Sequence, residues 1–359
     1  MKLINRSWPA LGLLIMAAAM SAPTLRSHGH AALSIDGEAP VVAIKVDPLP
    51  SQTKQLKFLD SFPKDKDEPS GIYFAQAQTL SHDHQGRIYV TDLRGCQIFV
   101  FSPDGGLLRK IGRSGQGPGE FNFPGKAALA RGQLVVLDVG NMRIQFFSQD
   151  GQFVRSARLL RTYADMTAAK DGTIYAVTAG NEPGDLIDTL GAEGERLSSF
   201  GRPPESVERG LASPRSWLAM SPKDELFVAY WFAPIVQVYS LGGELKVTFE
   251  IRYEPMLKKL SHNPSRNQVA PGGGRRIGQS IIEAIDVSES SFFILHRGTQ
   301  GRIDILEIKR DGTFLRDFWT RRSDDYYPMG LAVHEAGGMK TFYLLQIGPE
   351  NRVDVFVAK

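Results

Sequence analysis

The sequence has very few of the residues that form covalent cross-links and thiolate metal sites. Its 359 residues include one cysteine, Cys96. A single thiol excludes an internal disulfide framework, and it also excludes a zinc site built from several cysteines. If the folded chain binds a metal, oxygen or imidazole ligands must supply the site.

The sequence also lacks a strong excess of charge of either sign. Lys and Arg together number 42 and Asp and Glu 39, which gives a formal net charge of +3. This balance is too small to indicate nucleic acid as a partner. Hydrophobic residues make up 42% of the chain, so it can bury a sizeable core, and wholesale disorder is excluded.

Long hydrophobic runs are absent apart from one near the N-terminus. Lys2 and Arg6 precede the apolar run from Trp8 to Met20, which is too short to span a bilayer of about 30 Å. We predict a signal peptide at 1–22 and an exported, periplasmic or extracellular protein with no transmembrane helix in the mature chain. An uncleaved N-terminal anchor is the alternative. The Pro-, Ala- and Ser-containing stretch 23–53 has no clean periodicity and is interpreted as a linker.

Common catalytic signatures are missing as well. The sequence contains no G-x-S-x-G, H-E-x-x-H or G-x-x-x-x-G-K-[ST] motif. The Gly-rich stretch 112–119 superficially matches a nucleotide-binding loop, but Pro118 and the strand expected after it leave no place for the helix that such a loop requires. We therefore interpret it as a structural turn and favour a function other than catalysis.

An internal repeat of roughly 45 residues organises the rest of the chain. Six units each contain two β-rich stretches separated by a polar loop. The first stretches are 86–92, 132–138, 172–178, 224–230, 290–296 and 340–346. The second stretches are 97–101, 143–147, 185–190, 235–239, 302–308 and 352–357. Turns such as Asp104-Gly105 and Asp150-Gly151 follow several of the second stretches, as expected of tight hairpins.

Each unit also has a small-residue strand before these stretches, and the first five units have a further strand after the turn. Four-stranded antiparallel units repeated radially give an all-β fold, a six-bladed β-propeller. The predicted blades cover approximately 76–112, 123–160, 163–201, 215–252, 281–319 and 327–359. The last unit has no fourth strand, and 54–62 has the apolar spacing to supply it. We therefore predict one domain, 54–359, whose ring closes by pairing its two ends.

Two stretches carry a resemblance to a known family. The segments 143–153 (RIQFFSQDGQF) and 111–125 (IGRSGQGPGEFNFPG) resemble the NHL-repeat class of six-bladed propellers, of an exported bacterial type. Some enzymes with this ring, the lactonase-like and amidating-lyase-like families, hold a metal in the central channel. The resemblance thus implies an alternative function, a metal-dependent lyase or lactonase whose divalent cation would be bound by Asp165 and Glu283.

Strand direction predicts that the two faces of the ring differ in charge. The loops after second and fourth strands share one face, which collects five arginines: Arg94, Arg143, Arg297, Arg302 and Arg352. The same face bears a long basic insertion, 255–280, whose candidate residues are Lys258, Lys259, Arg275 and Arg276. The opposite face collects mainly acids. We expect a monomeric binding or scaffold module, without a cofactor, whose basic face binds a protein, a peptide or an anionic polysaccharide.

Overall fold

A computed structural model describes residues 39–63, 72–178, 185–204, 207, 215–261, 279–322 and 325–358. The predicted signal peptide and the candidates Arg275 and Arg276 lie outside the described residues. No helix in the described ranges is long and apolar enough to cross a membrane.

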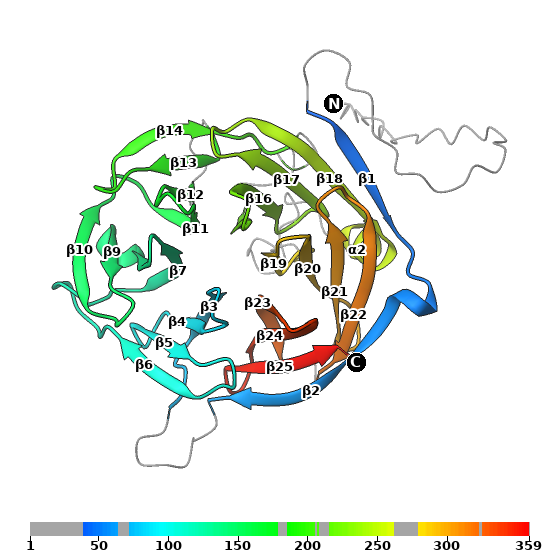
Figure 1. Cartoon of the computed structure of the whole chain (residues 1–359), viewed down its shortest axis with the longest axis horizontal. Helices are drawn as coiled ribbons and strands as arrows, with labels where there is room; N and C mark the ends of the chain where they lie inside the picture. The colour runs from blue at the N-terminus through cyan, green and yellow to red at the C-terminus, as the bar shows by residue number, and fades with distance from the viewer. Residues whose placement is uncertain are drawn as a thin grey trace, which may run out of the picture. The chain divides into compact units, whose positions relative to one another are not determined.

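The described chain from residue 39 onward forms mainly antiparallel sheets arranged in a ring of blades, and β3, β7, β11, β15, β19 and β23 lie nearest the centre (Figure 1). The first three blades comprise β3 (Ala77–His82), β4 (Ile88–Asp92), β5 (Gln97–Phe101) and β6 (Leu107–Ile111); β7 (Pro124–Ala130), β8 (Gln133–Asp138), β9 (Arg143–Phe147) and β10 (Phe153–Arg158); β11 (Tyr163–Ala168), β12 (Ile174–Thr178), β13 (Ile187–Leu190) and β14 (Arg196–Phe200). The next three comprise β15 (Ser216–Met220), β16 (Glu225–Tyr230), β17 (Ile235–Ser240) and β18 (Leu245–Tyr253); β19 (Ala284–Val287), β20 (Ser291–Arg297), β21 (Arg302–Lys309) and β22 (Phe314–Arg321); β23 (Tyr327–Ala336), β24 (Met339–Ile347), β25 (Arg352–Ala358) and β2 (Thr53–Phe62). The predicted all-β, six-bladed propeller is confirmed.

The ring closes through β2, as the sequence predicts. Residues Leu56–Phe62 of β2 pair antiparallel with β25 and form the fourth strand of the last blade. Thr53–Gln55, at the start of the same strand, pair parallel with β22, so β2 also joins the fifth blade to the sixth. Phe62 is fully buried, and its ring lies 4.5 Å from that of Phe101 in the first blade. The closure is therefore sealed by side-chain packing as well as by backbone pairing.

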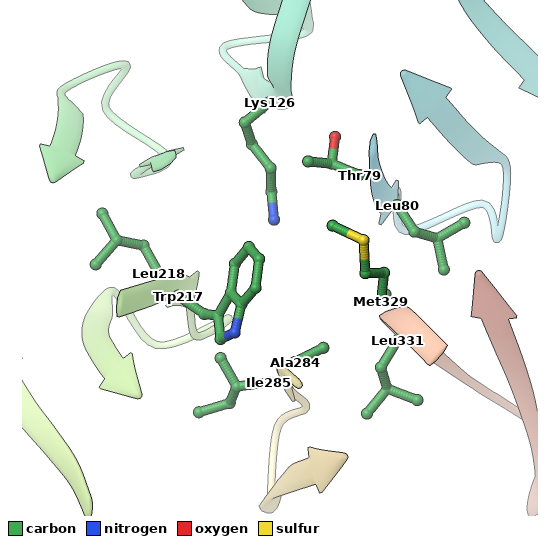
Figure 2. Close-up of a pocket in the computed structure, with 10 residues that line it drawn as sticks. Thr79, Leu80, Lys126, Trp217, Leu218, Ala284, Ile285, Met329 and Leu331 are labelled. Atoms are coloured by element: carbon green, nitrogen blue, oxygen red, sulfur yellow. The ribbon is translucent and has the colours of Figure 1, made fainter. Parts of the chain in front are cut away.

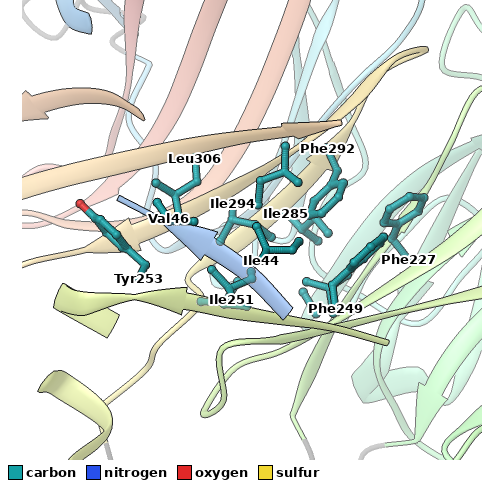
Figure 3. Packing of buried hydrophobic residues seen from close by; sticks show 14 of the residues in the cluster. Ile44, Val46, Phe227, Phe249, Ile251, Tyr253, Ile285, Phe292, Ile294 and Leu306 are labelled. Atoms are coloured by element: carbon teal, nitrogen blue, oxygen red, sulfur yellow. The ribbon is translucent and has the colours of Figure 1, made fainter. Parts of the chain in front are cut away.

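The interpretation of 23–53 as a linker is wrong for part of that stretch. Val41–Val46 form β1, which pairs parallel with β18 as a fifth, outermost strand of the fourth blade. Ile44 and Val46 alternate along β1 and are buried in a cluster that includes Phe249 and Phe292 (Figure 3). Their burial against the fourth and fifth blades supplies the physical reason for the strand, because alternate residues of a strand share one face.

The predicted basic insertion 255–280 begins within a helix. Glu254–Ser261 form the short helix α2, which follows β18 directly. Met256 on this helix is fully buried in the same cluster as Ile44. Burial of Met256 anchors the helix, so Lys258 and Lys259 have defined positions at the edge of the ring.

The centre of the ring is filled by side chains of the innermost strands. Lys126, Trp217 and Met329 converge there (Figure 2), and the remaining cavity has a volume of about 20 Å³. That space is about enough for one water molecule. This cavity therefore offers little room for an organic ligand.

Candidate functional site

Three of the predicted ligand-binding arginines occupy the same position in their blades, the first residue of the third strand. Each forms an ion pair with a fully buried carboxylate of its own blade: Arg143 Nε with Asp138 Oδ2 (2.8 Å), Arg302 Nε with Asp304 Oδ1 (2.6 Å) and Arg352 Nε with Asp354 Oδ1 (3.0 Å). A buried carboxylate needs such a partner, because an unpaired charge in the interior is costly. These arginines thus act within the blades.

Arg143 additionally holds the Gly-rich connector between the first two blades. Its guanidinium donates hydrogen bonds to the backbone carbonyls of Gln116 (2.8 Å), Gly117 (2.9 Å) and Glu120 (2.8 Å). The Glu120 carboxylate in turn accepts a hydrogen bond from the Gly117 backbone N–H at 2.9 Å. The connector is closed by its own contacts, which agrees with its interpretation as a structural turn.

The other basic candidates divide into two groups. Arg94 is exposed in the loop after β4, and exposed Lys258 pairs with Glu254 one turn earlier on α2. Lys259 and Arg297 instead meet: the Lys259 ammonium donates a hydrogen bond of 2.9 Å to the Arg297 carbonyl. The structure therefore brings together two of the predicted basic residues and disperses the others that it describes.

Lys259 and Arg297 line a pocket of about 550 Å³ among the connectors of the fourth, fifth and sixth blades. Ligand pockets typically have volumes of about 300–1,000 Å³. The pocket is lined by Trp231, Phe232, Lys259, Gln279, Ser280, Arg297, Gly298, Thr299, Gln300 and Tyr327. Its residues come from the loops after β16 and β20, from α2 and its following connector, and from the start of β23.

A buried carboxylate, Glu283, organises one side of this pocket. Its Oε1 accepts a hydrogen bond from the Ser280 hydroxyl and its Oε2 one from the Tyr327 hydroxyl, both at 2.6 Å. The Lys259 ammonium lies 3.6 Å from Oε1. Burial lowers the pKa of Lys259, although Glu283 opposes this, and burial together with Glu283 raises the pKa of the Tyr327 hydroxyl. Glu283 thus fixes three side chains at the pocket.

Aromatic side chains form another part of the lining. The Trp231 and Phe232 rings are stacked, with centroids 5.2 Å apart and an interplanar angle of 16°. Trp217, which fills the centre of the ring, contacts Trp231 with a centroid distance of 5.6 Å. The Arg297 guanidinium lies over the Tyr327 ring at 4.8 Å. The pocket therefore combines cationic groups with aromatic surface supported by the core.

The two predicted metal ligands have other partners. Glu283 contacts Ser280, Tyr327 and Lys259. Asp165 Oδ2 accepts a hydrogen bond of 2.7 Å from the Leu218 backbone N–H. The Lys126 ammonium lies 3.7 Å from Asp165 Oδ1, and burial raises the pKa of Asp165 although Lys126 opposes this. Within the described ranges, no three His, Cys, Asp or Glu side chains gather as a metal site would require.

His296 is a residue that the sequence analysis missed. It is fully buried, and its Nδ1 lies 2.8 Å from the Ile281 carbonyl, on the connector that carries Ser280. Burial lowers its pKa to about 4, so the ring is neutral at pH 7 and Nδ1–H donates this bond. Asp92, at the corresponding place in the first blade, instead accepts hydrogen bonds from the backbone N–H groups of Ala75 and Gln76. When the repeats are aligned, His296 stands where the first blade has Asp92, and this difference in the sequence could have identified His296.

Comparison with known proteins places the chain among the six-bladed propellers. The model of family DUF5128, described as a 6-bladed beta-propeller, matches residues 76–184. No curated protein matches the sequence significantly.

Solved structures of similar fold cover most of the chain at low sequence identity. A "Putative exported protein" from Bacteroides fragilis has a TM-score of 0.55 and 12% identity, covering 88% of this chain and 99% of its own. A duf4221 family member from Bacteroides vulgatus has a TM-score of 0.53 and 11% identity, covering 86% and 99%. Virginiamycin B lyase from Staphylococcus aureus has a TM-score of 0.52 and 11% identity, covering 84% and 98%. Identities this low establish a shared fold and leave the function open.

Proposed function

We propose that the chain is an exported, monomeric propeller of the NHL-repeat type that binds an anionic ligand without catalysing a reaction. The convergence of Lys259 and Arg297 in one pocket carries this proposal. Export is supported by the apolar run that follows Lys2 and Arg6, and the Bacteroides fragilis protein is itself described as exported. The connector held by Arg143 supports the NHL-type assignment.

Charge at the pocket explains the preference for an anion. Lys259 and Arg297 contribute two positive charges, and Glu283 contributes one negative charge that Ser280 and Tyr327 already stabilise. The net local charge is positive, and an arginine can bind a carboxylate through two parallel hydrogen bonds. Arg297 also lies at the end of a second strand, outside the repeated position at which Arg143 pairs with a buried acid.

The test compares binding of two polyanions with unrelated backbones, polyglutamate and polygalacturonate, by titration calorimetry. At least one should bind the purified chain, and Arg297→Gln should weaken binding by about 10- to 100-fold, as loss of a charge-assisted hydrogen bond predicts. Lys258→Ser is the matched control, because it removes one exposed charge from the residue next to Lys259 on the same helix. Binding of neither polyanion, or equal weakening in both variants, would overturn the proposal.

A further inference from the structure

The pocket contains a third kind of side chain that anion binding alone does not explain. Besides its cations and aromatic rings, it is lined by four neutral hydrogen-bonding residues: Gln279, Ser280, Thr299 and Gln300. Amide and hydroxyl side chains both donate and accept hydrogen bonds, which suits ligand hydroxyl groups. A ligand that uses the whole lining must therefore carry several hydroxyls as well as a negative charge.

The aromatic wall adds a requirement on ligand shape. Trp231 and Phe232 form a stacked pair that Trp217 supports from the centre of the ring. Such rings offer large apolar area with little loss of conformational entropy, and they suit a ligand with a rigid apolar face. A sugar ring presents C–H groups on its face and hydroxyls around its edge, so it satisfies both this wall and the neutral polar residues.

The charge and the volume of the pocket restrict the class of ligand further. Lys259 and Arg297 line the pocket, and the Arg215 guanidinium lies over the Trp231 ring at 4.9 Å. Positive groups therefore outnumber the carboxylate of Glu283 and favour an acidic ligand over a neutral one. An open pocket of about 550 Å³ has room for part of a short oligosaccharide, whereas an acidic protein surface needs an extended contact area. The neutral hydroxyl-binding residues favour a sugar over an acidic peptide.

We infer that the pocket binds a uronate-containing saccharide, with the carboxylate at Arg297 and the sugar ring against Phe232, which Trp231 supports from behind. This inference rests on the proposed function, because it identifies the ligand class of the same site. Gln279, Thr299 and Gln300 would bind the sugar hydroxyls.

The experiment titrates the purified chain with uronate trisaccharides, namely trigalacturonate, triglucuronate and trimannuronate, and follows tryptophan fluorescence and calorimetric heat. Two matched probes test the carboxylate and the sugar ring separately. The methyl ester of each trisaccharide keeps the sugar and removes the charge, and triglutamate keeps three carboxylates without a sugar ring. We expect at least one trisaccharide to bind at least about tenfold more tightly than its methyl ester and than triglutamate, a difference of about 1.4 kcal/mol.

Variants test the assigned contacts. Phe232→Ala should weaken trisaccharide binding and leave triglutamate binding unchanged, whereas Arg297→Gln should weaken both; thermal unfolding of each variant verifies folding. Triglutamate binding as tightly as every trisaccharide would overturn the sugar inference and leave the proposed function standing. Equal binding of the acids and their methyl esters would overturn both. Absence of binding by all three trisaccharides would overturn the inference, while the titrations with polyglutamate and polygalacturonate decide the proposed function separately.

Discussion

Two buried carboxylates in the fifth blade share one arginine, and this arrangement makes stability depend on pH. Arg302 donates hydrogen bonds to Asp304 at 2.6 Å and to Asp317 at 2.9 Å. The side chains of Asp304 and Asp317 are 0% and 1% exposed. Burial and the nearby Asp304 raise the pKa of Asp317 from 3.8 to about 7, although Arg302 opposes the rise. One cation cannot fully offset two buried anions, so Asp317 retains its proton.

The magnitude follows from linkage between proton binding and folding. Between pH 4 and pH 7 the folded chain holds a proton that the unfolded chain has released, so the free energy of unfolding falls as the pH rises. Each pH unit contributes about 1.4 kcal/mol, and the rise from 3.8 to about 7 corresponds to about 4 kcal/mol. The loss of unfolding free energy caused by ionisation of Asp317 is absent below pH 4 and complete above pH 7.

Asp317→Asn should therefore stabilise the chain at pH 8 by up to about 4 kcal/mol and change its stability little at pH 4. Asparagine keeps an oxygen for Arg302 and leaves the arginine paired with Asp304 alone. Urea unfolding of both proteins at pH 4, 5, 6, 7 and 8 measures the difference. Asp311→Asn serves as the control, because Asp311 is exposed and its pKa is lowered by the Thr313 backbone N–H, so no gain is expected at pH 8. A difference for Asp317→Asn that is constant with pH would refute the reasoning.

Two further predictions concern the pocket and the Gly-rich connector. Lys259→Met should lower the free energy of unfolding by about 1–3 kcal/mol because it leaves Glu283 without its cation, and adding Glu283→Gln should restore most of the loss. Chemical denaturation of both variants measures this, and additive losses would contradict the pairing. Gly112→Ala should destabilise the chain by about 2 kcal/mol or more, because Gly112 has a φ of +86° and an added Cβ would lie 2.2 Å from Phe121. A thermal unfolding midpoint within 1 °C of the original would exclude that clash.

The repeat period and strand alternation were sufficient to predict the ring and its closure. Leu56 and Phe62 are buried where β2 pairs with β25, whereas Phe58, which the apolar spacing also assigns to the buried side, is 44% exposed beside a shift in strand register. The same alternation is present in Val41–Val46, but prolines at 40, 48 and 50 gave that stretch the composition of a linker. Its partner, β18, lies some 200 residues away in sequence, and local pattern cannot supply such a parallel pairing.

The basic face shows why charge position alone is a weak guide to a binding site. Arg302 and Asp304 stand two residues apart on one strand, and so do Arg352 and Asp354. Residues two apart on a strand point to the same side, so each arginine lies beside a carboxylate. The sequence therefore contained the evidence that these arginines are paired internally. The positions of Lys259 and Arg297 depend on α2 and on a loop of another blade, and could not be deduced in this way.

The candidate pocket lies where the repeat departs from its own pattern. Asp92 and Asp138 end the second strands of the first two blades, and each accepts hydrogen bonds from the backbone of an incoming connector. In the fifth blade His296 lies one residue before the end of the second strand, and its imidazole instead donates to the carbonyl of Ile281 on the incoming connector. Because His296 donates a hydrogen bond where Asp92 and Asp138 accept one, it holds the connector without adding a buried anion. A carboxylate at this place would lie near Lys259 and Arg297 and would reduce the positive charge available to a ligand. Replacing His296 with Asp should consequently weaken anion binding as well as folding, which links the repeat's exception to the function proposed for the pocket.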